Sequence, residues 1–288
     1  AQVVVRELAG FAAAGVLGEA HTYSWRSPEV MLASVNGHRF GDAGEQVHAW
    51  QATLGADTTV FTIHPSKEAP SDGYWVGTAS MPRTAQKERA AIHIYQPSYA
   101  SPTDPLLGPY FSYLPFTRAW FPQDRFDEVT QSNGWTIGRK GDGYVALWSE
   151  RPTVWRAINA ADSASAGMTQ PYDLVAPGGA DNVWICEVGR AADHGDFDSF
   201  VDAVTNAEVT VTRGPGRIDV RYVSPVEGLL EFGSWSDFKV GGVVTPLRDH
   251  PRHSSPWGTS CEFSSYYDLH VGDARVQING ATGGRQLA

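Results

Sequence analysis

Residues 134–148, GWTIGRKGDGYVALW, carry the clearest fold signal in the chain. Two alternating apolar runs, residues 134–139 and 143–148, flank the segment Lys140-Gly141-Asp142-Gly143. Glycine and aspartate adopt the positive φ angles that tight hairpin turns require. The stretch therefore predicts two antiparallel strands joined by a short turn.

The same pattern recurs along most of the chain. Gly55-Ala56-Asp57 separates residues 46–54 from 58–63, and Gly272-Asp273 separates 266–271 from 274–279. Further strands are expected at residues 30–36, 90–96, 183–189, 208–213, 217–223, 228–233 and 242–245. Strands at this density, without helices between them, predict antiparallel sheets stacked face to face.

Helical signals are confined to two places. Apolar residues recur at helical spacing over residues 1–17, and residues 196–204 fit one short helix with Asp196 as its N-cap. The predicted fold is therefore all-β. We expect a large antiparallel β super-sandwich over residues 20–288, preceded over residues 1–19 by a short helix or linker from a preceding helical region.

Composition excludes several classes of partner. Of the 288 residues, 42% are hydrophobic and 19% are charged, which is typical of a folded, lightly charged chain. The net charge of −10 argues against unspecific binding to nucleic acid or to an anionic membrane. No apolar run is long enough to cross a bilayer. We expect neither nucleic acid nor a membrane as a partner.

Aromatic residues are abundant, with 10 Trp, 11 Tyr and 12 Phe beside 30 Gly and 18 Pro. Two interpretations stay open: the tryptophans fill a sandwich core, or aromatic faces cover sugar rings at a carbohydrate surface. Segments 64–89 and 97–126 are predicted as long irregular loops. Loops of this length are functional or pack against a partner, here a helical domain or a second subunit.

The two cysteines allow two interpretations. Cys186 lies in an apolar run that predicts a buried strand, where a free thiol is the default state. A long-range disulfide with Cys261 is the alternative if the protein is exported.

Histidines carry the first chemical hypothesis, because the chain has no Gly-rich phosphate loop, CxxC, HExxH or GxSxG motif. His48 and His64 lie at the open end of one predicted hairpin and are expected side by side. Together they would bind a structural divalent metal such as Zn, or one would act as acid or base. Glu88 and His93 are the nearest candidates for a third ligand. The alternative is two histidines that only pack in loops.

A second hypothesis concerns the segment around residues 73–83. The planar guanidinium of Arg83 matches a carboxylate. Tyr74 would donate or accept a proton, and Trp75 with Tyr74 would form a platform for sugar. The alternative is a surface ion pair with two packing aromatics. By strand periodicity, His48 and Trp50 are expected on one face of their strand.

Three segments together resemble the β half of heparinase II/III-like polysaccharide lyases. Residues 44–54, GEQVHAWQATL, resemble the His-containing strand of that family. Residues 60–65, VFTIHP, lie where the family has a short motif near "DPG", with His64 in place of the acid. Residues 90–95, AAIHIY, resemble the strand that follows its long loop. The resemblance is one of pattern and covers roughly residues 20–100.

The resemblance implies an N-terminal α/α toroid, a C-terminal β super-sandwich and an active cleft between them. In the family the β domain supplies a catalytic or substrate-orienting histidine, some members hold a structural zinc near the hairpin, and the toroid usually supplies a catalytic tyrosine. The chain would then be the C-terminal portion of a longer, secreted or periplasmic enzyme, with little turnover on its own. Because His64 stands in place of the family acid, the resemblance does not by itself imply the family's metal site in this chain.

The predicted function is β-elimination in an acidic, uronate-containing polysaccharide or oligosaccharide. A base takes the proton α to the carboxylate while another group neutralises the acid. His48 is the predicted acid/base or acid-neutralising group, Arg83 the carboxylate clamp, and Tyr74 and Trp75 the sugar platform.

Two alternatives come from other classes of protein. The first is a non-catalytic carbohydrate-binding or scaffolding domain. The second is a glycoside hydrolase, which needs two carboxyl groups across a sugar. Its best candidates are the acids in aromatic context, Asp124, Asp127 and Glu128.

Overall fold

The computed structural model describes residues 21–36, 48–65, 80–97, 114–157 and 167–247, and strand segments at 253–255, 258–260, 266–271, 273–279 and 284–287. The chain divides into two compact units, residues 1–245 and 246–288. Each unit is described by itself. The predicted helix over residues 1–17 lies outside the described residues, and the domain predicted over 20–288 extends across both units.

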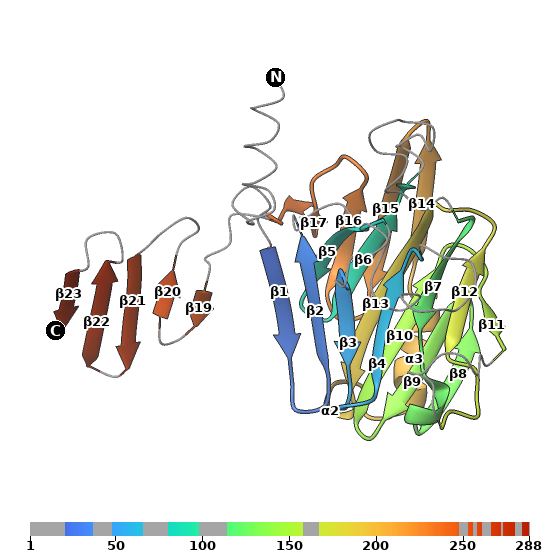
Figure 1. The fold of residues 1–288 in the computed structure, drawn as a ribbon, viewed down its shortest axis with the longest axis horizontal. Coiled ribbons are helices and arrows are strands. Elements are labelled where there is room, and N and C mark those ends of the chain that lie inside the picture. Colours follow the sequence, from blue (N-terminus) through green and yellow to red (C-terminus); the bar gives the residue numbers. More distant parts are fainter. Residues whose placement is uncertain are drawn as a thin grey trace. The chain divides into compact units, whose positions relative to one another are not determined.

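Three antiparallel sheets build the first unit (Figure 1). The seven-stranded sheet has the order β1 (His21–Arg26), β2 (Met31–Asn36), β3 (Trp50–Thr53), β4 (Thr59–Ile63), β7 (Phe116–Trp120), β12 (Asp173–Pro177), β11 (Val154–Arg156). The six-stranded sheet has the order β5 (Arg83–Lys87), β6 (Ala90–Tyr95), β13 (Asn182–Arg190), β10 (Gly143–Ser149), β9 (Trp135–Lys140), β8 (Glu128–Ser132). The five-stranded sheet has the order β14 (Val209–Gly214), β15 (Arg217–Ser224), β16 (Gly228–Gly233), β17 (Lys239–Val240), β18 (Val243–Val244).

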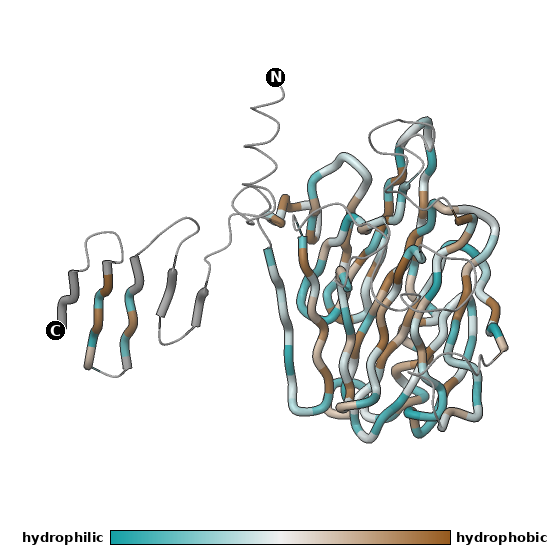
Figure 2. The backbone as a smooth tube through the Cα atoms, in the orientation of Figure 1, coloured by the Kyte–Doolittle hydropathy of each residue, from teal (hydrophilic) through white to brown (hydrophobic). Residues whose placement is uncertain are grey.

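The main core lies between the seven-stranded and six-stranded sheets. Trp50 from one sheet and Trp184 from the other are fully buried there. Each indole N–H is satisfied by a threonine: Trp50 Nε1 donates to Thr62 Oγ1 at 2.7 Å, and Trp184 Nε1 to Thr117 Oγ1 at 2.8 Å. Hydrophobic residues follow the inner strands in Figure 2. For these two tryptophans the core interpretation is confirmed.

The other face of the six-stranded sheet carries a second layer. Alternation along β13 turns Trp184 and Cys186 toward the main core and Glu187 toward the five-stranded sheet, where it meets Tyr222 of β15. Next to this sheet, helix α3 (Phe197–Thr205) packs on β9 and β10. A single turn, α2 (Ala191–His194), precedes α3, and a 3₁₀ turn, η3, spans Gln123–Arg125.

The predicted fold class is confirmed: within the described ranges the strands pair antiparallel and the helices are short. The hairpin turns also agree with the sequence. Lys140 pairs with Gly143, Ala52 with Val60, and Val271 with Ala274. Asp196 caps α3, because its Oδ1 accepts the Ser199 N–H at 2.8 Å.

The two predicted long loops need a correction. Segment 64–89 contains β5, and segment 97–126 contains β7, which pairs with both β4 and β12 near the middle of the seven-stranded sheet. Their sequences, RTAQK and FTRAW, lack a sustained apolar alternation. Both strands are specified by pairing with distant strands, so local pattern does not identify them.

The second unit is an antiparallel meander of β19 (His253–Ser255), β20 (Gly258–Ser260), β21 (Tyr266–Val271), β22 (Ala274–Asn279) and β23 (Gly284–Leu287). Arg275 on β22 donates to Asp268 on β21, with Nε at 2.9 Å from Oδ1. This bond lowers the pKa of Asp268 to about 2. Among the described helices of the whole chain, none has the length and apolar character of a membrane span.

Candidate functional site

The outer face of the seven-stranded sheet, opposite the main core, carries one row of chemically distinctive side chains. Cross-strand register aligns Phe61 of β4 with Trp120 of β7, Trp120 with Asp173 of β12, and Asp173 with Arg156 of β11. Residues directly opposite in antiparallel strands share a face. The row spans three strand spacings, on the order of 14 Å between the outermost Cα atoms.

Aromatic rings form the first half of this row. The His48 imidazole stacks on Phe61 with ring centroids 3.7 Å apart and planes at 16°. Phe61 and Trp120 are nearly parallel at 6.3 Å, and Trp120 meets Tyr172 at 5.2 Å. The three aromatic residues are buried in a cluster separate from the main core, whereas His48 is half-buried. His48 therefore lies at the accessible edge of a fixed aromatic cluster.

Charged groups form the second half. Arg118, two residues before Trp120 and on the same face, is fully buried, and its Nη1 lies 3.4 Å from Asp173 Oδ2. Arg156 Nε lies 3.8 Å from the same carboxylate oxygen, and its guanidinium lies over the Phe116 ring at 5.0 Å. Among the described residues, two arginines thus meet one buried carboxylate. Arg156 is the half-buried arginine of the two and faces outward.

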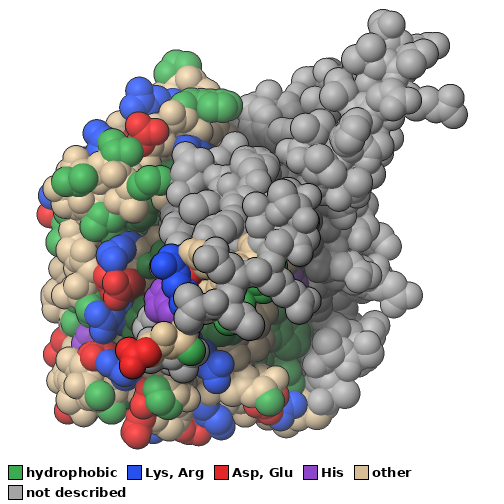
Figure 3. Space-filling view, turned by 90° about the vertical axis from the view of Figure 1, so that its left-hand side faces the viewer, with side chains coloured by type: hydrophobic (Ala, Val, Ile, Leu, Met, Phe, Trp, Pro, Cys, Tyr) green, Lys and Arg blue, Asp and Glu red, His purple; other side chains and the backbone are tan. Residues whose placement is uncertain are grey.

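On the face drawn in Figure 3, acidic and basic side chains lie next to one another over the part of the surface drawn in colour.

The prediction that His48 and Trp50 lie on one face of their strand is wrong. Trp50 points into the main core, where it stacks on His93 at 4.4 Å, whereas His48 stacks on Phe61 of the outer cluster. The reason is local: β3 begins only at Trp50, after a bend at Ala49, so strand alternation does not reach back to residue 48.

His64 is fully buried beyond the end of β4. Its Nε2 lies 3.2 Å from the Leu114 carbonyl oxygen, and burial lowers its pKa to about 4. The structure gives His48 and His64 different neighbours, and their shared metal stays a prediction. Within the described ranges, no three His, Cys, Asp or Glu side chains are placed to hold an ion.

The candidate third ligands have structural roles instead. His93 is fully buried, and its Nδ1 lies 3.2 Å from Thr84 Oγ1. Burial holds its pKa well below the ordinary value, so the ring is neutral and packs against Trp50. Glu88 occupies the turn between β5 and β6 with a φ of 40° and pairs with Lys87 at 2.8 Å.

Arg83 lies far from the row. Thr84 faces the main core, so its neighbour Arg83 faces the five-stranded sheet. Its Nη1 donates to the carbonyl oxygens of Gly233 and, at 2.8 Å, Ser236, and its guanidinium lies 4.5 Å from the Phe232 ring. The structure therefore gives Arg83 a role in holding the loop after β16. Tyr74 and Trp75 lie outside the described residues.

The acids of the hydrolase hypothesis also hold backbone and neighbouring strands in place. Asp124 accepts the backbone N–H groups of Thr169 and Gln170; burial alone would raise its pKa, but these bonds outweigh burial and lower it. Asp127 accepts the Gly141 N–H at 2.7 Å, which lowers its pKa. Glu128 pairs with Arg139. A general acid needs a raised pKa, so this geometry does not favour a glycosidase pair.

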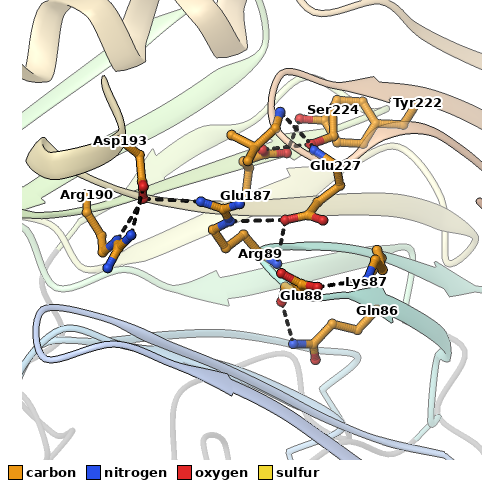
Figure 4. Close-up of polar contacts among 11 residues, drawn as sticks. Gln86, Lys87, Glu88, Arg89, Glu187, Arg190, Asp193, Tyr222, Ser224 and Glu227 are labelled. Atoms are coloured by element: carbon orange, nitrogen blue, oxygen red, sulfur yellow. Dashed lines mark hydrogen bonds and ion pairs between the residues drawn. The ribbon is translucent and has the colours of Figure 1, made fainter. Parts of the chain in front are cut away.

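Sequence reasoning missed a buried carboxyl group, Glu187, on the central strand β13 (Figure 4). The hydroxyls of Tyr222 and Ser224 donate to its two oxygens at 2.6 and 2.8 Å. Burial raises its pKa to about 8 and outweighs these two bonds, which lower it. The carboxyl therefore holds a proton at neutral pH. The sequence does contain one signal of this site: Glu187 is a charged residue inside an apolar run that predicts a buried strand.

Polar contacts continue from Ser224 through Glu227 to Arg89, in the turn between β5 and β6. The Arg89 guanidinium lies 3.0 Å from Glu227 and 3.2 Å from Asp193, and Arg190 pairs with the same Asp193 at 2.7 Å (Figure 4). These contacts join the six-stranded sheet to the five-stranded sheet and to α2. Since Glu187 is fully buried, the cluster connects layers and is not a substrate site.

Cys186 is a free, fully buried thiol on the opposite face of β13 from Glu187, as the free-thiol interpretation predicts. Burial keeps its pKa well above the ordinary value, so it is not a thiolate nucleophile.

Comparison with known proteins gives no family: no protein-family model matches the sequence, and no curated protein matches it.

Proposed function

We propose that the chain is the β portion of a polysaccharide lyase, and that its first unit binds a uronate-containing glycan along the outer face of the seven-stranded sheet. The observation that carries the proposal is the register row: half-buried Arg156 and half-buried His48 lie at its two ends, and the buried aromatic cluster between them holds His48 in place. A guanidinium suits a carboxylate, and an imidazole suits proton transfer.

His48 is the residue we assign to the reacting sugar. As a base it takes the proton α to the uronate carboxylate; the C–H electrons form the new double bond, and the C–O bond to the neighbouring sugar breaks. As a cation it would instead neutralise the carboxylate while a group from a partner helical domain takes the proton. Its half-buried ring on Phe61 is fixed in orientation, which either role requires.

Arg156 replaces Arg83 as the carboxylate-binding residue. Its Cα lies on the order of 14 Å from that of Phe61, on which His48 stacks, so Arg156 binds the acid of another sugar in the chain and not that of the reacting one. Arg118 and Asp173 are positioning residues: the buried pair holds the charge to which Arg156 is anchored.

The same separation favours a second candidate function, glycan binding without turnover. With the acid/base candidate and the anchored arginine far apart, the described residues form a binding face more completely than a reaction centre. This is the non-catalytic carbohydrate-binding domain that the sequence leaves open.

One experiment separates these functions. The chain is run in native gels containing alginate, hyaluronan or chondroitin sulfate, and incubated with each while absorbance of the unsaturated uronate product is followed. We expect retardation that Arg156→Met weakens, and a low turnover that His48→Ala lowers by about 100-fold. His270→Ala, an exposed histidine in the second unit, is the matched control.

The outcomes are distinct. Retardation without turnover supports the binding domain. Turnover that survives His48→Ala contradicts the role of this histidine, and the absence of both signals contradicts both functions.

A further inference from the structure

The loop after β16 exposes a large aromatic side chain. Trp235 is 71% exposed, whereas the other tryptophans within the described ranges are buried or half-buried. Its Nε1 donates to the Gly216 carbonyl oxygen, in the β14–β15 turn, at 2.8 Å. The indole is thus held by its polar edge while most of its surface faces solvent.

The backbone around Trp235 is held from several sides. Ser234 N donates to the Ile218 carbonyl at 2.8 Å, and Ile218 N donates to Ser234 Oγ at 3.0 Å. Arg83 Nη1, on the neighbouring six-stranded sheet, donates to the carbonyl oxygens of Gly233 and Ser236 on either side. The loop is therefore rigid by its hydrogen bonding, and binding to it would cost little ordering entropy.

The immediate surroundings of the indole are polar. Arg217 follows Gly216 directly and pairs with Asp219; the side chain of Arg217 is 61% exposed. Asp219 is also the register partner of Gly233, two residues before Trp235, so a charged pair lies on the strand next to the loop that carries the indole. An apolar ring with polar groups nearby suits a sugar, which presents an apolar C–H face edged by hydroxyl groups.

We propose that Trp235, fixed by Gly216 and by the Arg83-anchored loop, is a sugar-binding platform on the five-stranded sheet. A protein partner would need about 800 Å² of complementary surface on each side, and the chain neighbours of Trp235 are small or charged: Ser234, Ser236 and Asp237. The ligand is a single sugar ring within a glycan chain. Its identity as an acidic glycan rests on the proposed function.

The platform and the row lie on different layers. The five-stranded and seven-stranded sheets pack on opposite faces of the six-stranded sheet. Trp235 therefore belongs to a second binding surface that raises the local concentration of a long glycan near the unit without taking part in the reaction.

Retardation in gels containing alginate, hyaluronan or chondroitin sulfate tests the platform. We expect Trp235→Ala to weaken apparent affinity about five- to tenfold and Trp235→Phe to weaken it less, because phenylalanine keeps a stacking face but loses the N–H that donates to Gly216. Val243→Ser is the control: Val243 is 69% exposed on β18 of the same sheet. Arg83→Met should weaken retardation less than Trp235→Ala, since it acts through the loop backbone.

Retardation of Trp235→Ala equal to that of the unchanged chain would overturn the platform. If the oligomeric mass of the chain then changes on Trp235→Ala, the loop is a protein contact. The proposed lyase function fails separately, if Trp235-dependent retardation persists while no polysaccharide yields unsaturated product.

Discussion

Asp173 and Glu187 are both buried carboxyl groups, and the first unit neutralises them in opposite ways. Asp173, on the outer face of the seven-stranded sheet, lies between the guanidinium groups of Arg118 and Arg156. Glu187, between the six-stranded and five-stranded sheets, accepts hydrogen bonds from Tyr222 and Ser224 and keeps its own proton. Burial of an isolated charge costs free energy, so a buried carboxyl group is either paired with a cation or protonated.

The difference separates a candidate binding face from a structural contact. Asp173 keeps its charge and is paired with two arginines, of which Arg156 is half-buried. A protonated carboxyl leaves no charge and acts only through hydrogen bonds. The first arrangement suits recognition of an acidic ligand; the second suits a joint between layers.

The largest effect is expected from breaking the Asp173 arrangement. Arg118→Met removes the fully buried guanidinium that pairs with the Asp173 carboxylate and should destabilise the chain by about 3 kcal/mol. Urea unfolding measures the change. Arg221→Met, which removes an exposed pair with Glu208, is the control and should cost under about 1 kcal/mol.

A double variant sharpens this test. Adding Asp173→Asn to Arg118→Met removes the uncompensated charge and should recover part of the loss. If Arg118→Met alone is no worse than Arg221→Met, the buried pair does not hold the face together.

The next effect is a pH dependence at Glu187. Because its pKa rises from 4.5 to about 8 on folding, the folded state binds the extra proton between these values. Its contribution to stability is therefore present below about pH 4.5 and is lost as pH rises toward 8, by an amount on the order of a few kcal/mol. Glu187→Gln, which cannot ionise, should abolish this part of the decline.

Unfolding free energies of both proteins at pH 5 and pH 8 provide the measurement. His64 acts in the opposite sense: its lowered pKa makes stability rise with pH between about 4 and 6.5, so only the difference between variant and unchanged chain isolates Glu187. An identical pH dependence in both would show that Glu187 ionises freely in the folded state.

The smallest effect is expected from one hydroxyl. Tyr222→Phe removes a donor to Glu187 Oε2 and should cost about 1–2 kcal/mol near pH 8, where the carboxyl begins to ionise. Since that bond lowers the Glu187 pKa, its loss should also move the midpoint of the stability decline to higher pH. Tyr144→Phe is the control, because Tyr144 is buried against Phe197 and Phe200. A midpoint unmoved by Tyr222→Phe would contradict the assignment.

Much of the strand pattern was predictable, and the candidate site was not. The three hairpins with Gly and Asp turns have the predicted pairing, since the turn residues fix register locally. The row of Phe61, Trp120, Asp173 and Arg156 comes from four strands spread over more than a hundred residues. No local pattern joins them. Moreover, β7 lies within segment 97–126, whose prolines led to the prediction of a loop.

Individual residues show the same limit. The site role of His48 stays a prediction, whereas its expected place on one face with Trp50 is wrong, because β3 begins only after a bend at Ala49. Arg83 was predicted to bind a carboxylate, whereas it binds backbone carbonyls of a distant loop. Glu187 appeared only as one polar residue in an apolar run.

Local signals in the sequence specify the all-β class, the hairpins and the short capped helix at Phe197–Thr205, because turn chemistry, alternation and capping act within a few residues. Only the packed sheets show which strands are neighbours and which face each strand buries, and so where Asp173 meets Arg118 and where Glu187 meets Tyr222. Those outcomes depend on desolvation and on contacts between residues far apart in the chain, and both arise only when the sheets pack.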